Sequence, residues 1–226
     1  MARPSTPLLT RERIRSAALA MVDRDGLDGL SMRRLAADLG VRAASLYGYL
    51  ATKEELLTDL ADEVLAGVDS SGFTAGWREG LTGWARSYRE ALAAHPNLVP
   101  FLAHSPGRRP QALRHADAVH GGLTGAGWPP RYATMIGAST KYLVVGAAMT
   151  SFSGGFADDV EVYVGRYPNL SQAHLLAGHE EIDRDSFELA LTAFLDGLSR
   201  LYDQVARPGS EPGVRSGSEK ADRSRT

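Results

Sequence analysis

The sequence predicts an all-α fold with a small N-terminal domain of three helices and a larger helical domain after it. Apolar residues recur at three- and four-residue spacing along most of the 226 residues, and glycine or proline separates the segments. The alternation typical of a strand occurs only at Val160, Val162 and Val164. We therefore expect an N-terminal domain at 1–51, a second domain at 52–206 and a disordered tail at 207–226.

The first helix has both a start and a stop signal. Thr10 can cap it, because a threonine oxygen accepts a hydrogen bond from the free N–H groups of the first turn. Leu9 and Ile14 have the spacing of a hydrophobic staple across that cap. Gly26 ends the apolar pattern.

Three further short helices are predicted before residue 70. Ser31 can cap the second helix, and Gly40 supplies the positive φ with which it ends. The third helix covers about residues 42–50. The fourth begins with a capping box that runs from Thr52 to Glu55.

The second domain continues as longer and more apolar helices. We expect them near residues 77–94, 97–104, 109–125, 129–152 and 184–205. Residues 153–183 are expected to be mostly loop, with a short helix at 171–178. Residues 133–152 are apolar enough to raise the question of a membrane span, but Lys141 lies at their middle, where a charge costs at least about 2.5 kcal/mol. We therefore expect a buried interface helix there and no membrane contact.

Residues 31–50 meet the packing requirements of a helix-turn-helix. Two helices that cross over a short turn need a small residue at their contact, here Ala36, and a glycine in the turn, here Gly40. The buried corner needs apolar residues, which are Leu35, Leu39, Val41 and Leu46. A hairpin in an ordinary helical bundle can meet the same requirements, so this pattern alone does not decide the function.

Residues 40–57 (GVRAASLYGYLATKEELL) resemble the signature of the TetR family of transcriptional regulators. The matching positions are Gly40, Val41, Leu46, Tyr47, Tyr49, Lys53 and Glu54. Residues 84–104 are more loosely similar to the ligand-binding domain of the tetracycline-repressor branch. The resemblance implies a DNA-binding transcriptional regulator, a repressor that binds a palindromic double-stranded operator as a homodimer and is released by a small-molecule effector.

The distribution of charge agrees with a nucleic-acid partner for the N-terminal domain. The net charge of the chain is −2, but residues 1–53 hold nine basic side chains against five acidic ones, and the rest of the chain is acidic. The resemblance and the exposed edge of the predicted third helix together predict the DNA contacts. They are Arg33, Arg42, Ala43, Ala44, Ser45, Tyr47, Tyr49 and Lys53.

Two of these positions, and the neighbouring Gly48, have simpler explanations. Tyr47 could be a core aromatic that seals the second helix against the third, and Arg33 could belong to an ordinary solvated surface. Gly48 departs from the family pattern; it either weakens the helix, by about 1 kcal/mol relative to alanine, or allows a closer approach to the DNA backbone.

The last helix and the helix at 129–152 are expected to form the dimer interface. The resemblance implies that these two helices pair with their copies in a second subunit. One short recognition helix also reads too few base pairs for specific binding, so two half-sites are needed. The alternative for the apolar stripe of the last helix is an intramolecular core. That stripe consists of Phe187, Leu191, Phe194, Leu195, Leu198, Leu201 and Tyr202.

A small-molecule pocket is expected among the helices of the second domain. Its candidate lining residues are Trp84, Tyr88, Phe101, His104, His115, His120, Trp128 and Tyr142. Phe101 falls where the tetracycline repressors place a magnesium-coordinating histidine, with His104 nearby, so we expect no metal and no cofactor. The acidic run at 179–183 is better explained as a solvated loop than as a metal site.

Other functional classes find little support. The chain has no cysteine, no G-x-S-x-G elbow, no H-E-x-x-H pair and no P-loop, so we expect no enzymatic activity. A small-molecule sequestration protein that does not bind DNA is the remaining alternative. Residues 1–10 lack the apolar stretch of a secretory signal, and we expect a cytoplasmic protein.

Overall fold

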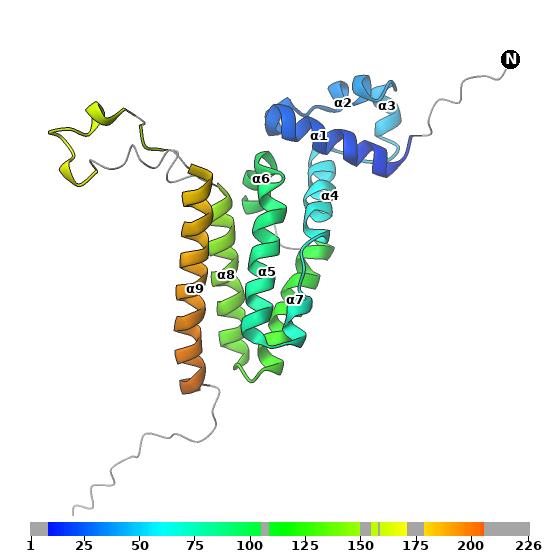
Figure 1. Ribbon diagram of the computed structural model, residues 1–226. Helices are drawn as coiled ribbons and strands as arrows, with labels where there is room; N and C mark the ends of the chain where they lie inside the picture. The colour runs from blue at the N-terminus through cyan, green and yellow to red at the C-terminus, as the bar shows by residue number, and fades with distance from the viewer. Residues whose placement is uncertain (1–8, 105–108, 150–154, 158, 171–178, 206–226) are drawn as a thin grey trace, which may run out of the picture.

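The computed structural model describes residues 9–104, 109–149, 155–157, 159–170 and 179–205. These ranges contain helices and no strand, which confirms the predicted all-α fold (Figure 1). The α-helices are α1 (Arg11–Gly29), α2 (Met32–Asp38), α3 (Ala43–Leu46), α4 (Lys53–Ala66), α5 (Trp77–Ala93), α6 (Val99–His104), α7 (Pro110–Gly125), α8 (Pro130–Met149) and α9 (His179–Val205). Short 3₁₀ turns are η1 (Ser71–Thr74), η2 (Pro96–Leu98), η4 (Val160–Val162) and η5 (Pro168–Leu170).

The start and stop signals of the N-terminal helices lie where the sequence predicts them. The Thr10 hydroxyl accepts a hydrogen bond from the backbone N–H of Arg13, and the Ser31 hydroxyl accepts one from Arg34, both at 3.2 Å. Gly26 leaves the helical conformation with φ 74°, which bends the chain near the end of α1. Each of these signals involves only a few neighbouring residues, so the sequence alone is enough to predict where these helices begin and end.

The third helix is shorter than predicted. Instead of running to residue 50, α3 ends at Leu46, and residues 47–49 form a turn in which the Tyr49 N–H donates to the Leu46 carbonyl. Gly48 lies within this turn, and a glycine there disfavours continuation of the helix. A Cβ at Gly48 would meet only the Ser45 carbonyl oxygen, at an ordinary 3.5 Å.

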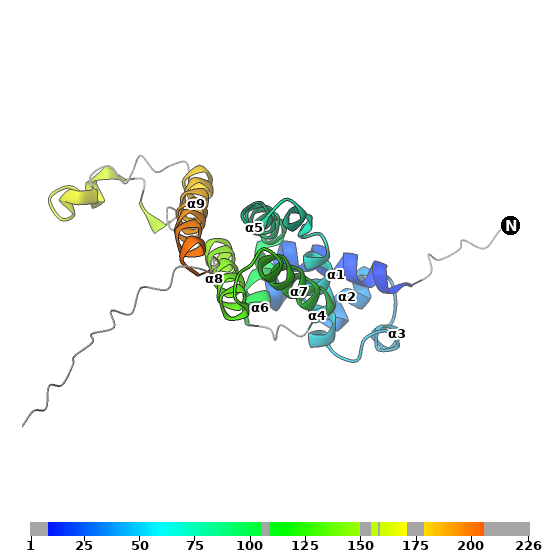
Figure 2. The same ribbon diagram turned by 90° about the horizontal axis from the view of Figure 1, so that it is seen from below.

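The larger domain is built around α5 and α7, with α8 packed against both and α9 against α8. Figures 1 and 2 show α8 and α9 side by side at the edge of the helical bundle farthest from α1–α4. Ion pairs from Arg78 to Asp196 and from Arg86 to Glu188 join α5 to α9. The helix α4 packs on α1 at one side and on α7 and α5 at the other, so it connects the two domains.

One expectation for the second domain is wrong. The last helix begins at His179 rather than at 184, so the acidic run at 179–183 is helical and not a loop. The valine alternation at 160–164 forms no strand, which agrees with the predicted all-α fold, and Val160–Val162 is a 3₁₀ turn. The expected helix at 171–178 and the expected tail at 207–226 lie outside the described residues. No helix in the described ranges is long and apolar enough to cross a membrane.

Candidate functional site

The helix-turn-helix is assembled by the apolar residues that the sequence assigns to it. Leu35 and Ala36 of α2 and Leu46 of α3 are buried, and so is Leu50 after the turn. Gly40 has φ 69°, and a Cβ there would meet nothing within 4 Å, so the backbone conformation and not crowding requires glycine. The motif therefore holds α3 by its inner side and leaves its outer side free.

Most of the predicted DNA-contacting residues lie on the outer side of α3 or directly beside this helix. Arg42, Ala44 and Ser45 are exposed, Ala43 is half-buried, and Arg33 on α2 is exposed. The side chain of Tyr47 is 55% exposed, so the alternative of a core aromatic is wrong. Ala43 packs partly against the core, and the other side chains lie on the exposed surface.

Two of the predicted contact residues also have structural partners, which the sequence analysis missed. The Tyr49 hydroxyl donates to the Leu9 carbonyl at 2.7 Å, and the half-buried Lys53 donates from Nζ to the Leu27 carbonyl at 2.8 Å. An ammonium group has three N–H donors, so this bond leaves two for another acceptor. Lys53 thus joins the start of α4 to the bend after Gly26.

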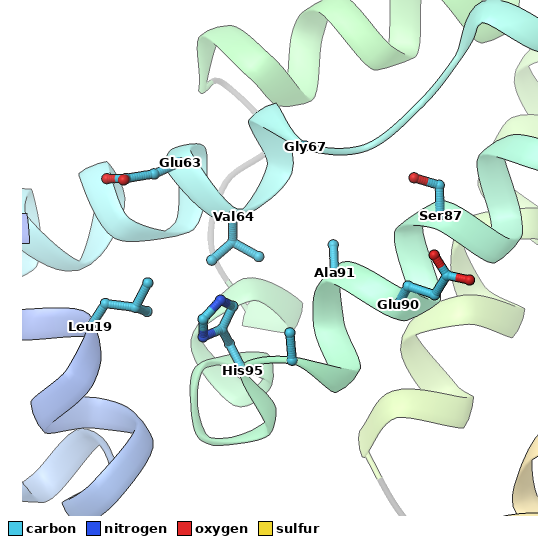
Figure 3. Close-up of a pocket in the computed structure, with 9 residues that line it drawn as sticks. Leu19, Glu63, Val64, Gly67, Ser87, Glu90, Ala91 and His95 are labelled. Atoms are coloured by element: carbon cyan, nitrogen blue, oxygen red, sulfur yellow. The ribbon is translucent and has the colours of Figure 1, made fainter. Parts of the chain in front are cut away.

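A groove of about 380 Å³ lies between α1, α4 and α5 (Figure 3). Its lining includes Leu19 from α1, Glu63 and Val64 from α4, and Glu90 from α5, and His95 lies between these elements in the figure. The His95 ring is 3.0 Å from Asp23 of α1. Two carboxylates, those of Glu63 and Glu90, line this groove where α1 meets α4 and α5.

A second cavity, of about 290 Å³, lies inside the larger domain between α4, α5, α7 and α8. Its described lining comprises Leu65, Trp84, Tyr88, Arg109, Ala112, His115, Ala116, Val119, His120, Ala133, Thr134, Gly137, Ala138 and Lys141. Aromatic and small apolar groups form most of the wall, and a few polar groups converge on it. This combination is typical of a small-molecule site.

Four of the eight candidate lining residues are in this cavity: Trp84, Tyr88, His115 and His120. The other four are elsewhere. Trp128 is only 2% exposed and packs with Trp77, Tyr132 and Tyr202, so it belongs to the core. Tyr142 is 74% exposed, Phe101 packs partly buried against the core, and the His104 ring bonds to the Pro100 carbonyl at 2.8 Å.

The sequence analysis missed the two cations of the cavity, Arg109 and Lys141. Arg109 lies at the N-terminal end of α7 with 5% of its surface exposed, and its Nε and Nη1 atoms have no hydrogen-bond partner within the described residues. Burial lowers the pKa of its guanidinium. Lys141 was noted only as an argument against a membrane span, although a charge within an apolar helix is itself a signal for a polar cavity.

The aromatic and histidine side chains of the cavity offer further polar atoms. His115 donates from Nε2 to the Leu65 carbonyl of α4 at 2.8 Å, and its other ring nitrogen, Nδ1, is buried without a partner. The indole nitrogen of Trp84 is also buried and unpaired. Burial raises the pKa of the Tyr88 hydroxyl, which keeps it protonated. Within the described ranges, no cluster of three or more His, Asp or Glu could hold a metal ion.

Comparison with protein families agrees with both parts of this architecture. Residues 14–60 match the bacterial regulatory proteins of the tetR family, and residues 72–202 match the tetracyclin repressor-like C-terminal domain. The chain belongs to the TetR family. It is therefore a helix-turn-helix transcriptional regulator and not an enzyme, as the sequence predicts, and the loose resemblance to the tetracycline-repressor branch is confirmed.

Two TetR relatives illustrate the range of similarity. The HTH-type transcriptional repressor DrrR1 of Streptomyces coeruleorubidus is 32% identical over 225 residues, which cover 89% of this chain and 83% of the relative. An HTH-type transcriptional regulator of Saccharopolyspora erythraea is 34% identical over 143 residues, which cover 62% of this chain and 60% of the relative.

Two solved TetR structures share the fold. A possible TetR family transcriptional regulator of Streptomyces coelicolor superimposes with a TM-score of 0.73 at 32% identity, covering 85% of this chain and all of that one. The TetR family protein ActR of Streptomyces coelicolor, in complex with actinorhodin, superimposes with a TM-score of 0.68 at 29% identity over 85% and 98% of the two chains.

Proposed function

We propose that this TetR protein is a cytoplasmic repressor that binds a palindromic operator as a homodimer and releases it when a small molecule enters the cavity between α4, α5, α7 and α8. The observation that carries the proposal is the exposed polar side of α3, held by a packed helix-turn-helix on the basic domain. A repressor among the relatives and the ActR–actinorhodin complex support the mode of regulation.

In this proposal, the exposed side chains on α3 and beside it make different kinds of contact with the DNA. Arg42 reaches a phosphate or the O6 and N7 atoms of a guanine, and Ala43 or Ala44 meets a thymine methyl group. Ser45, Tyr47 and Tyr49 supply hydroxyl groups, while Arg33 and Lys53 contact phosphates on either side of the helix.

The dimer interface we propose uses the outer side of α8 and α9. On α8, Met135, Tyr142 and Met149 are exposed and recur every seven residues, so they form one apolar stripe. On α9, Leu189 is 74% exposed, whereas Phe187, Leu191, Leu195 and Leu198 are buried in their own subunit. For those four residues the intramolecular core is the correct explanation, and a different face of α9 is left for a partner.

The helix α4 is the element through which the cavity can act on DNA. Its C-terminal end carries Leu65, which lines the cavity and accepts the hydrogen bond from His115. Its N-terminal end carries Lys53, which we propose contacts phosphate. A ligand that shifts α4 would change the separation of the two recognition helices and so favour a state that does not fit the operator.

The test begins with selection of bound fragments from the organism's own genomic DNA, followed by titration of the selected duplex at two salt concentrations. Log affinity should fall with log salt by about 0.9 per phosphate contacted. If Arg42 contacts phosphate, Arg42→Ala removes one contact per subunit and should reduce that slope by roughly 2 in the dimer. Arg114→Ala, an exposed arginine on α7, is the matched control and should leave the slope unchanged. Failure to enrich any fragment, or a slope near zero, would overturn the proposal.

A further inference from the structure

Arg109 is the least expected residue of the cavity, because it is a buried cation with no counterion among the described residues. No ion pair within 4.0 Å joins its guanidinium to a carboxylate of the described chain, and two of its three nitrogens have no hydrogen-bond partner. Burying an unpaired charge is strongly unfavourable. An unpaired cation that is buried in a cavity is therefore a candidate binding site for an anion.

The charges around Arg109 are also unbalanced. Lys141 lines the same cavity, and none of its described lining residues is acidic. Asp62 acts on Arg109 from a distance, but its Oδ1 accepts a hydrogen bond from the Gln111 backbone N–H at 2.8 Å. The potential inside the cavity is therefore positive, which favours an anion.

The rest of the wall fits an apolar ring system. Trp84 and Tyr88 lie with their ring centroids 5.8 Å apart and offer an aromatic surface. Small residues of α7 and α8 line the same cavity: Ala112, Ala116, Ala133, Gly137 and Ala138. The volume of about 290 Å³ is at the lower end for small-molecule sites.

We propose that the effector is a small organic anion, an apolar ring system that carries a carboxylate, and that Arg109 binds this carboxylate in the interior of the cavity. Carboxylate oxygens match the parallel N–H donors of a guanidinium, and the Trp84 indole N–H is a further donor in the same cavity. Lys141 adds a second positive charge from α8. This inference rests on the proposed function in treating the cavity as the effector site.

A carboxylate of a second copy of this chain is the alternative that could neutralise Arg109. In that case the guanidinium would be a dimer contact, and its removal would weaken the dimer instead of altering ligand preference. The two cases are separated by measuring oligomeric state and ligand affinity on the same variants.

The experiment uses calorimetric titration of the full chain with matched compounds on the same ring. The acids are benzoate, naphthalene carboxylate and biphenyl carboxylate, each paired with its neutral carboxamide. We expect at least one acid to bind about 30-fold more tightly than its amide, which is about 2 kcal/mol at 1.4 kcal/mol per tenfold. Arg109→Met should remove that preference, Arg109→Lys should retain part of it, and Arg114→Met on the exposed side of α7 should leave it unchanged.

Three results would overturn the inference: equal binding of acids and amides, no binding of any acid at millimolar concentration, or an unchanged preference in Arg109→Met. Dissociation of the Arg109→Met dimer would assign the guanidinium to the subunit interface and would overturn it as well. Operator binding is measured separately with and without the acid. A chain that prefers the acid but binds no DNA would refute the proposed function and leave the cavity chemistry standing.

Discussion

The ring of Phe73 occupies a slot between α5 and α7 that exists because both helices present glycine to it. A Cβ at Gly80 of α5 would lie 2.3 Å from Cδ1 of Phe73. A Cβ at Gly122 of α7 would lie 2.3 Å from the same atom and 2.7 Å from the Phe73 Cβ. Gly121, the preceding residue of α7, has nothing within 4 Å of the same added atom.

Substituting alanine at these two neighbouring glycines separates crowding from helix propensity. Both Gly121→Ala and Gly122→Ala gain up to about 1 kcal/mol from propensity within α7. Gly122→Ala also overpacks the slot, at a cost of about 1–3 kcal/mol. The added Cβ would lie within 3.0 Å of Cδ1, Cγ and Cβ of Phe73, so turning the outer end of the ring cannot relieve the clash and the ring must leave the slot. The difference between the two variants is therefore about 1–3 kcal/mol, and Gly121→Ala should be the more stable.

Thermal unfolding followed by circular dichroism measures this difference. A chain of this length shifts by roughly 2–4 °C per kcal/mol, so the two midpoints should differ by at least about 2 °C. Both variants are compared at one protein concentration, because association of subunits would make the midpoint concentration-dependent. Equal midpoints for Gly121→Ala and Gly122→Ala would show that Phe73 does not fill the slot as described.

Three further predictions concern the N-terminal domain and its junction. Leu46→Ala should destabilise that domain by about 2–5 kcal/mol in urea unfolding, whereas Tyr47→Ala should weaken operator binding with little loss of stability; unfolding by Tyr47→Ala would contradict its exposure. Thr52→Ala removes the hydroxyl that accepts from the Glu55 N–H and should cost about 1 kcal/mol, seen as faster amide exchange in the first turn of α4; unchanged exchange would refute the cap. Asn97→Ala removes the side-chain amide that donates to the carbonyl oxygens of Val22 and Asp23. The variant should change how strongly the effector weakens operator binding, and an identical effector response would exclude this contact from the coupling between the effector and operator sites.

Sequence reasoning succeeded where the determinant is local. The caps at Thr10 and Ser31 and the left-handed turn at Gly40 depend on a few consecutive residues, and all three lie where predicted. The family signature then identified the N-terminal domain, because the helix-turn-helix imposes its residue types at short spacing.

The errors arise where distant segments decide. The exposure of Tyr142 and the burial of Trp128 depend on which side of each helix meets its neighbours, and residue type alone cannot supply this. Arg109 carries no signal in the sequence, since an arginine before a proline at the start of a helix is ordinary. Its lack of partners is seen only in the folded chain, where Arg109 lines the cavity together with residues of α5, α7 and α8.

All but three of the 25 basic residues are arginine. The two lysines within the described ranges lie at the proposed DNA surface and in the proposed effector cavity. Lys53 supports the proposed DNA surface, and Lys141 lines the cavity. A reagent that acylates amines therefore attacks one lysine at each of these two places, besides Lys220, and spares the arginines. In the unaltered protein, protection of Lys53 would report occupancy by nucleic acid and protection of Lys141 occupancy by effector, read together in one mass spectrum.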